Sequence, residues 1–476
     1  MNIADPIALA YLVLEWTIRV VMLVVVTSRR SPEEARTWLL FVFFLPVPTL
    51  VFYLFAGRSK SPRWRRKRFR KARTLLEGAA RQIEHSHHCS RPEVSANLAP
   101  ATRLIEGLSH FPVLGGNVIC LLPSYQSTIN HLVQDIERAK NHVHLATYIF
   151  ANDDTGDRVL AALLAVAKRG VECRVLIDAV GSYASASGVI SKLRAGGIRA
   201  ERALPVSILR PHSMRGDIRN HRKIAVIDGR TGYIGSQNII DEASSTGLIN
   251  KELVVRIVGP AVLELQAIFA ADWFLETGSA IAHIHFFPHE HSEGGSAVQL
   301  LASGPEYRLA SAGLLIVALV HGAQRKVVLT TPYFVPDDAL RLALQAAALR
   351  GVDVELVLSR ISDSWLVALA QRSYYHELLA AGVVIHLYRD GLLHAKHVSV
   401  DDEIVIIGSL NLDMRSFNLN AEASLVCYDP AVAVELRAEQ QKNIAASDPL
   451  DSNIWNDRRL TAKLAQNIAR LFSPLL

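Results

Sequence analysis

The stretch His221-Arg-Lys-Ile-Ala-Val-Ile-Asp228, followed by Gly235-Ser-Gln-Asn238, decides the fold of this chain because it occurs twice. The second copy is His394-Ala-Lys-His-Val-Ser-Val-Asp401, followed by Gly408-Ser-Leu-Asn411. The distinctive residues keep the same internal spacing in both copies, which indicates an internal duplication rather than coincidence. Two half-sites of this kind predict one shared active site.

The residue types in these copies suit phosphoryl transfer. A phosphodiester carries negative charge, and attack at phosphorus adds to it, so cations and hydrogen-bond donors stabilise the transition state. The candidates for this role are Lys223, Ser236, Asn238, Lys396, Ser409 and Asn411. Histidine titrates near pH 6.5, so one imidazole can be a neutral nucleophile while the other protonates the departing oxygen. His221 and His394 supply that pair.

The double motif resembles that of the phospholipase D superfamily. The resemblance implies that His221 forms a covalent phosphohistidine and that His394 acts first as general acid and then as general base. It also implies that Asp228 and Asp401 brace the fold of their own motifs. Neither a metal ion nor another cofactor is required by this chemistry.

A carboxylate downstream of each motif orients the histidine of the opposite half in this superfamily. Glu422 lies where the superfamily has that acid in the second half. Glu252 occupies the corresponding place in the first half, where relatives more often carry Asp. The resemblance therefore implies two histidine-orienting residues, Glu252 and Glu422.

Length and pattern predict an α/β protein built from two phospholipase D-like α/β/α sandwich halves that share one active site. At 476 residues the chain exceeds one ordinary core. We assign residues 99–275 to the first half, residues 276–297 to a His- and Gly-rich linker and residues 298–476 to the second half. Apolar runs alternate with helical patterns. The predicted strands are 143–150, 171–177, 327–331 and 352–358, and the predicted helices are 158–168 and 340–349.

The N-terminal segment, residues 1–57, predicts a transmembrane helical hairpin. Residues 37–57 carry no charge and match the roughly 20 residues that a spanning helix needs, with Pro46 and Pro48 expected to bend it. Residues 7–28 form a second span that contains Glu15 and Arg19, which can pair four residues apart. An amphipathic helix lying in the membrane interface is the alternative for this first segment.

Residues 58–98 form a basic juxtamembrane segment and linker. Ten Lys and Arg residues and no acid lie between Arg58 and Arg73. Subtracting them from the formal net charge of +6 leaves about −4 for the remainder, so the body is not basic and nucleic acid is not a favoured partner. The segment suits anionic membrane lipid and also serves as a topology signal, which places the catalytic part in the cytoplasm.

Three further segments carry expectations. The histidine clusters at 85–89 and 283–291 have ligand-type residues, but polar linkers explain them better than metal sites. The C-terminal stretch 457–476 places leucines and isoleucine at helical spacing, and we expect this apolar face to pack onto the second half rather than to touch the membrane.

The membrane hairpin, the basic edge and the double motif together resemble the bacterial cardiolipin synthases of this superfamily. So do Tyr148-Ile-Phe150, Asp178-Ala-Val-Gly181, Thr331-Pro-Tyr-Phe-Val-Pro336 and Asn411-Leu-Asp-Met-Arg-Ser-Phe417. The resemblance implies an integral, multi-pass protein of the bacterial inner membrane. It would transfer a phosphatidyl group from one phosphatidylglycerol to another, giving cardiolipin and glycerol. A phospholipase D hydrolase, or a phosphatidyltransferase with a different alcohol acceptor, is the alternative. The sequence makes no prediction of oligomeric state.

Overall fold

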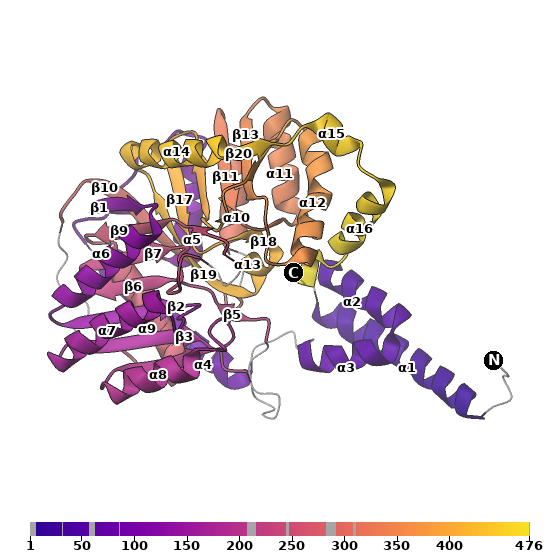
Figure 1. Ribbon diagram of the computed structural model, residues 1–476, viewed down its shortest axis with the longest axis horizontal. Coiled ribbons are helices and arrows are strands. Elements are labelled where there is room, and N and C mark those ends of the chain that lie inside the picture. The colour runs from indigo at the N-terminus through magenta and orange to yellow at the C-terminus, as the bar shows by residue number, and fades with distance from the viewer. Residues whose placement is uncertain are drawn as a thin grey trace.

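The computed structural model describes residues 6–30, 32–56, 62–84, 86–206, 216–243, 247–281, 292–307 and 311–475. Figure 1 shows a mixed α/β body from which the N-terminal helices project at one side. These projecting helices are α1 (Pro6–Arg29), α2 (Pro32–Phe44) and α3 (Pro46–Ala56). They pack on one another around a small apolar cluster that includes Met22, Val26 and Trp38.

The N-terminal helices differ in part from the predicted hairpin. Helix α1 covers the first predicted span, and among the described residues it is the one helix long and apolar enough to cross a membrane. Glu15 and Arg19 form the expected ion pair at 3.1 Å. The predicted single helix over 37–57 is wrong, because the chain breaks at Leu45 between α2 and α3. Proline has no N–H to donate within a helix but fits its first turn, so Pro46 starts a new helix instead of bending the old one.

The basic segment is a helix docked on the body rather than an extended linker. Helix α4 (Arg63–Glu84) packs against α9 (Val262–Thr277). Arg65 on α4 is buried and forms ion pairs with Glu276 at 2.8 Å and Glu306 at 2.6 Å. Arg68 donates to the carbonyl oxygens of Leu275 and Glu276, where the last turn of α9 leaves them unpaired. Part of the basic charge therefore holds α4 in place.

One large sheet runs through the body. Its first part is built from residues 99–281. These contain α5 (Ala99–Ser109), β1 (Leu114–Leu122), α6 (Tyr125–Arg138), β2 (His142–Thr147), α7 (Asp154–Lys168), β3 (Glu172–Asp178), α8 (Ala186–Ala195), β4 (Arg199–Ala203), β5 (Arg219–Asn220), β6 (Ile224–Ile227), β7 (Thr231–Gly235), β8 (Asn250–Lys251), β9 (Val254–Val258) and α9.

The remaining elements follow in residues 296–475. They are β10 (Ser296–Ser303), α10 (Ser311–Gly322), β11 (Lys326–Thr331), β12 (Phe334–Val335), α11 (Asp338–Leu349), β13 (Asp353–Ser359), α12 (Trp365–Ala380), β14 (Val384–Tyr388), β15 (Leu392–Leu393), β16 (His397–Val400), β17 (Ile404–Gly408), β18 (Leu412–Asp413), α13 (Met414–Asn418), β19 (Asn420–Cys427), α14 (Pro430–Ala445), β20 (Ser447–Pro449), α15 (Ser452–Asn456), α16 (Leu460–Arg470) and a final 3-10 turn (Ser473–Leu475).

Equivalent strands of the two parts occur in the same order outward from the centre of the sheet. The full order is β20-β14-β13-β11-β16-β17-β19-β10-β1-β9-β7-β6-β2-β3-β4. Antiparallel pairing of β1 with β10 forms the centre, and on each side three parallel strands, β2-β3-β4 and β11-β13-β14, lie outside the antiparallel ones. The duplicated motif thus sits in duplicated strands, β6-β7 and β16-β17. The strands and helices predicted from sequence are confirmed, with boundaries shifted by a few residues.

Helices cover both faces of the sheet. In β3, Val175 and Ile177 belong to a cluster with α6, α7 and α8, while Leu176 between them belongs to a cluster with α9 and α4. This alternation is what a strand buried on both faces requires. Helix α16 behaves differently from the prediction, because its leucines are exposed and Gln466 and Ala469 face the body instead.

Candidate active site

The two His-x-Lys segments lie in short links between strands. His221 to Lys223 join β5 to β6, and His394 to Lys396 join β15 to β16. The short strand before each link pairs with a strand that carries the other motif or lies near it. Strand β5, before the first motif, pairs with β19, and β15, before the second motif, pairs with β8. His221 N–H also donates to the carbonyl of Ala421 at 2.9 Å. The backbone therefore brings both motifs to one place.

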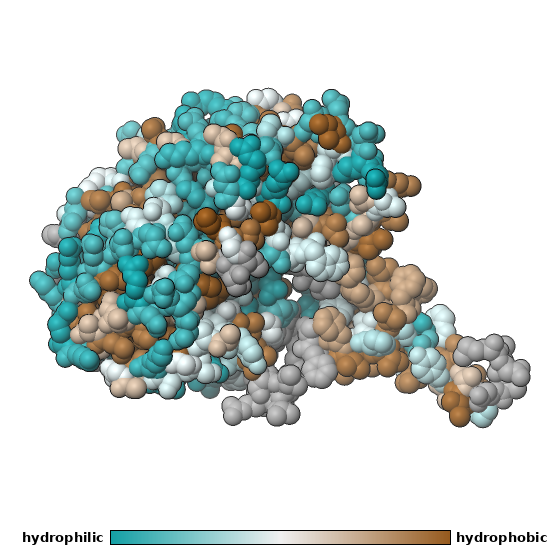
Figure 2. Space-filling model, in the orientation of Figure 1, coloured by the Kyte–Doolittle hydropathy of each residue, from teal (hydrophilic) through white to brown (hydrophobic). Residues whose placement is uncertain are grey.

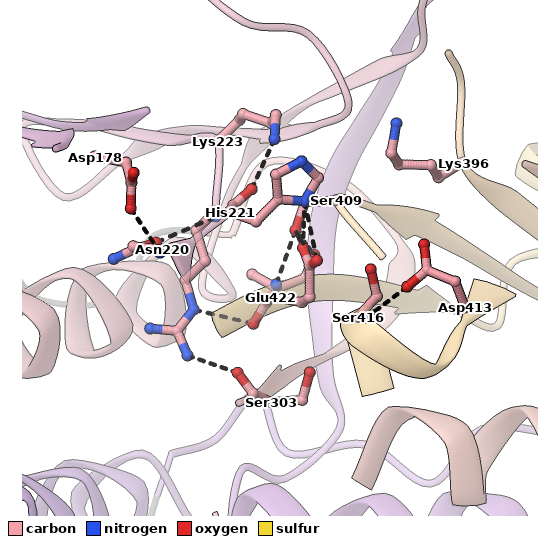
Figure 3. Close-up of polar contacts among 12 residues, drawn as sticks. Asp178, Asn220, His221, Lys223, Ser303, Lys396, Ser409, Asp413, Ser416 and Glu422 are labelled. Carbon is pink, nitrogen blue, oxygen red and sulfur yellow. Dashed lines mark hydrogen bonds and ion pairs between the residues drawn. The ribbon is translucent and has the colours of Figure 1, made fainter. Parts of the chain in front are cut away.

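Each motif histidine contacts a glutamate from the other part of the chain. Nδ1 of His221 lies 2.9 and 3.0 Å from the two carboxylate oxygens of Glu422, as Figure 3 shows. Nδ1 of His394 lies 2.7 Å from Oε1 of Glu252. The two glutamates are buried. Holding Nδ1 leaves Nε2 of each ring as the nitrogen that can react.

The two histidine–glutamate pairs have the same chemistry but different electrostatics. Burial lowers the pKa of His221 well below 6.5, and the cations of Lys223 and Lys396 lower it further. Burial also lowers the pKa of His394, but Glu252 acts in the opposite direction. Burial raises the pKa of Glu422 to about 7. Burial acts likewise on Glu252, yet the charge and hydrogen bond of His394 outweigh it and bring its pKa below 4.5. The second pair is the one better able to hold a proton on histidine.

Both motif lysines are buried near the histidines. Burial lowers the pKa of Lys223 to about 7 and that of Lys396 to about 8, while Glu422 and Glu252 respectively oppose the change. Nζ of Lys223 donates to the carbonyl of His221 at 2.8 Å. It also lies 5.2 Å from the ring centroid of Tyr148. A bound phosphate would place negative charge beside these two amines and so favour their protonated form.

The motif aspartates lie in the turns that follow their strands. The carboxylate of Asp228 accepts hydrogen bonds of 2.7 to 2.9 Å from the backbone N–H groups of residues 140–142. Asp401 accepts three of 2.7 to 2.8 Å from residues 324–326. Both have positive φ, 53° and 52°, which Asp tolerates better than most residues. Each aspartate ties its motif to the start of the adjacent antiparallel strand, β2 or β11.

The motif serines have other partners than the phosphate expected from the sequence. Ser409 is buried, and its hydroxyl donates to Glu422. The hydroxyl of Ser236 is likewise buried and bonds the backbone of Leu253 at 3.0 and 3.1 Å. The two hydroxyls therefore fix Glu422 and the backbone next to Glu252.

The motif asparagines differ from each other. Oδ1 of Asn238 accepts from the backbone N–H of Ile149 at 3.2 Å. Oδ1 of Asn411 is buried with no hydrogen-bond partner. The free Oδ1 of Asn411 can accept a hydrogen bond from a ligand hydroxyl, whereas a contact with a phosphate oxygen would use its amide nitrogen as the donor.

Several residues around the histidines escaped the sequence analysis. Arg222, between the first histidine and lysine, points away from them and forms a buried ion pair with Asp272. It also donates to the carbonyl of Glu422 at 2.9 Å, which fixes β19 against the first motif. The ring of Tyr148 lies 5.0 Å from that of His221. The sequence identifies Tyr148 and the Asn411–Phe417 stretch only as similar to the bacterial cardiolipin synthases, because nothing in their spacing assigns them a role.

Asp413 and Arg415 follow the second motif. Asp413 caps α13 by accepting from the N–H of Ser416 at 2.6 Å, and burial raises its pKa to about 6. Arg415 donates to the carbonyl of Asp217 at 3.0 Å. Within the described part of the chain, no group of three or more metal-ligating side chains is present. His85 and the cluster at 283–291 lie outside the described residues.

Comparison with known proteins gives the family. The family described as "Cardiolipin synthase, PLD-like domain" matches residues 132–273 and 316–444, and "Phospholipase_D-nuclease N-terminal" matches residues 17–58. Cardiolipin synthase A of Yersinia pseudotuberculosis serotype O:3 (strain YPIII) is 35% identical over 97% of this chain and 95% of its own length. The same figures hold for cardiolipin synthase A of Edwardsiella ictaluri (strain 93-146).

A solved structure supports the same fold. The phosphatidylserine synthase of Haemophilus influenzae Rd KW20 superposes with a TM-score of 0.61 at 17% identity, covering 79% of this chain and 98% of that protein. The sequence relatives match nearly the whole length of the chain. The chain therefore belongs to the bacterial cardiolipin synthase family of the phospholipase D superfamily, and it is a phosphatidyltransferase.

Proposed function

We propose that this enzyme transfers the phosphatidyl group of one phosphatidylglycerol to the terminal hydroxyl of another, giving cardiolipin and glycerol. The observation that carries the proposal is the crossed pairing of His221 with Glu422 and of His394 with Glu252. It brings a nucleophile and an acid–base group from separate motifs together beside two lysines. The choice of substrate comes from the relatives, which are named cardiolipin synthase A and match this chain over nearly their whole length.

In the first step, Nε2 of His221 attacks phosphorus and forms a P–N bond. The bond from phosphorus to the glycerol oxygen breaks, and His394 gives its proton to that oxygen. The low pKa of His221 keeps its ring neutral and nucleophilic. The ionised Glu252 supports the imidazolium form of His394 before the proton moves.

In the second step, neutral His394 removes the proton from the terminal hydroxyl of the acceptor lipid. The resulting oxygen attacks phosphorus, and the P–N bond to His221 breaks. Lys223, Lys396 and Asn411 stabilise the negative charge on the non-bridging oxygens in both steps. Asp228 and Asp401 fix the motifs to the adjacent strands. Ser236 holds the backbone of Leu253 next to Glu252, and Ser409 holds the carboxylate of Glu422.

The chain is divided, on this proposal, into two sandwich halves of residues 99–275 and 298–476 joined by the segment 276–297. The mirrored strand order supports the division. Residues 1–57 anchor the enzyme in the bacterial inner membrane. Helix α1, with 24 residues, is long enough to span the hydrocarbon. Helices α2 and α3, with 13 and 11 residues, return the chain so that the basic helix α4 and the catalytic body lie in the cytoplasm.

The test is product analysis with purified enzyme and phosphatidylglycerol labelled in its glycerol headgroup. We expect cardiolipin and free labelled glycerol in equal amounts from the wild type, and neither from His221→Ala. The wild type should also yield an acid-labile phosphatidyl-enzyme that the variant lacks. Phosphatidic acid as the main product would assign water as the acceptor and overturn the synthase reaction. A trapped adduct in His221→Ala would overturn the nucleophile.

A further inference from the structure

The C-terminal helix α16 exposes its apolar side chains. The exposed fractions are 81% for Leu460, 58% for Leu464, 48% for Ile468 and 51% for Leu471. Residues four and three apart on a helix lie on one face, so these side chains form a single stripe. The residues that α16 buries against the body are the polar Gln466 and the small Ala469. An amphipathic helix of a water-soluble protein normally has the opposite orientation.

Specific contacts hold α16 in this orientation. It packs along α12, where Arg470 forms an ion pair of 2.8 Å with Glu377 and lies over the ring of Tyr374. Just beyond the helix, the hydroxyl of Tyr374 donates to that of Ser473 at 3.0 Å. These contacts are all on the side opposite to the stripe. Rotating the helix to bury its leucines would break them.

The stripe continues onto the membrane helices. At its C-terminal end the hydroxyl of Thr37 on α2 donates to the carbonyl of Leu471 at 3.0 Å. The rings of Phe41 on α2 and Phe472 lie 5.2 Å apart. In Figure 2, hydrophobic surface extends from the region of α16 to that of α2 and α3 along one side of the molecule. The apolar face is therefore attached to the helices that meet lipid in the proposed function, on which this inference rests.

The charge of the segment suits an anionic surface. Arg458, Arg459 and Lys463 lie at the start of the helix, after Asp457, and Arg459 is exposed, whereas Arg470 is paired with Glu377. Helices that lie in a membrane interface combine an apolar face with Lys and Arg at its borders. Anionic headgroups attract such cations within a Debye length of the surface.

We infer that α16 lies in the membrane interface, with Leu460, Leu464, Ile468 and Leu471 inserted among the lipid chains. The occupant of the stripe is the anionic bilayer itself. The body is then held against the membrane at α16 as well as through α1 to α3. This inference concerns membrane contact and holds for any acceptor that the enzyme uses.

Site-directed spin labelling of the full-length protein tests the inference. A nitroxide is attached at Leu464→Cys, and in a matched protein at Val434→Cys. Val434 is 62% exposed on α14, which lies at the other end of the body from α1 to α3 (Figure 1). Cys89 and Cys120, the two exposed native thiols, are replaced by Ser in both. The proteins are reconstituted in vesicles of equal parts phosphatidylglycerol and phosphatidylcholine.

The readout is the collision rate of the nitroxide with oxygen, which concentrates in lipid, and with a nickel chelate, which stays in water. We expect the oxygen-to-nickel ratio to be several-fold higher at 464 than at 434. Equal ratios at the two positions would show that α16 faces water and would overturn the inference. Low collision rates with both reagents at 464 would show that protein, such as a second copy of the chain, covers the stripe, and would overturn it equally. Activity does not enter this readout.

Discussion

Replacing Glu422 by Gln tests the electrostatic design of the site. Glu422 holds Nδ1 of His221, accepts from Ser409 and supplies negative charge beside Lys223. A hydrogen bond to a charged group contributes about 1.5–3 kcal/mol and a neutral one about 1. The substitution therefore removes roughly 1–2 kcal/mol from the imidazolium-like transition state, a loss of roughly 5- to 30-fold in kcat/KM.

The same substitution shifts the pH profile. Lys223 is cationic below its pKa, which burial lowers to about 7 while Glu422 opposes that change. Since the phosphate needs the cation, kcat/KM falls as pH rises through this value. Without Glu422 the pKa drops further, and each 1.4 kcal/mol of lost interaction moves it by about one unit. The fall in kcat/KM of Glu422→Gln should occur at a pH about one unit lower than that of the wild type.

The assay is release of glycerol from phosphatidylglycerol in mixed micelles, measured as kcat/KM between about pH 5 and 9, because this parameter reports groups of the free enzyme. Glu137→Gln, which removes an exposed carboxylate on α6, is the control and should match the wild type. Thermal unfolding of all three proteins excludes a folding defect. If kcat/KM of Glu422→Gln falls at the same pH as that of the wild type, Glu422 does not set the charge of Lys223, and the reasoning is refuted.

Three further outcomes follow from the site. His394→Ala should slow glycerol release by about 10²–10⁴, yet much less with a p-nitrophenyl phosphatidyl ester, whose leaving group needs no proton; an equal loss on both substrates would remove His394 from the acid role. Asp401→Ala should lower the free energy of unfolding by about 2–4 kcal/mol, because three backbone N–H groups lose a charged acceptor, and an unchanged unfolding temperature would contradict this. EDTA should leave the rate unchanged, and strong inhibition would mean that a metal ion takes part.

The sequence allowed the double motif, the α/β alternation and the approximate strands to be predicted, because each depends on local spacing. It could not show which way a side chain turns when its partner is far along the chain. The sequence predicts that Ser409 binds phosphate, but it could not show that the buried hydroxyl also donates to Glu422, 13 residues further along the chain. Arg65 was counted with a membrane-facing charge run, yet two carboxylates from residues 276 and 306 bury it.

The predictions for two helical segments were wrong for a related reason. Periodicity predicts that α16 is amphipathic, but not whether water, protein or lipid meets the apolar face. The break at Leu45 depends on whether Pro46 lies inside one helix or begins another, and both arrangements fit the same composition. Such choices are decided by packing against elements that lie elsewhere in the chain.

The surroundings of the two motifs explain how they can take the opposite roles that we propose for them. The motifs carry the same residues, so their difference must come from what surrounds them. His221 sits against a glutamate whose pKa burial raises to about 7, whereas Glu252 beside His394 has a pKa below its ordinary value. In the proposed mechanism, this difference keeps the first histidine neutral for attack and supplies the second with a carboxylate that stabilises its cation. On the proposed division of the chain, each carboxylate comes from the opposite half, so the docking of the two halves assembles both histidine–glutamate pairs.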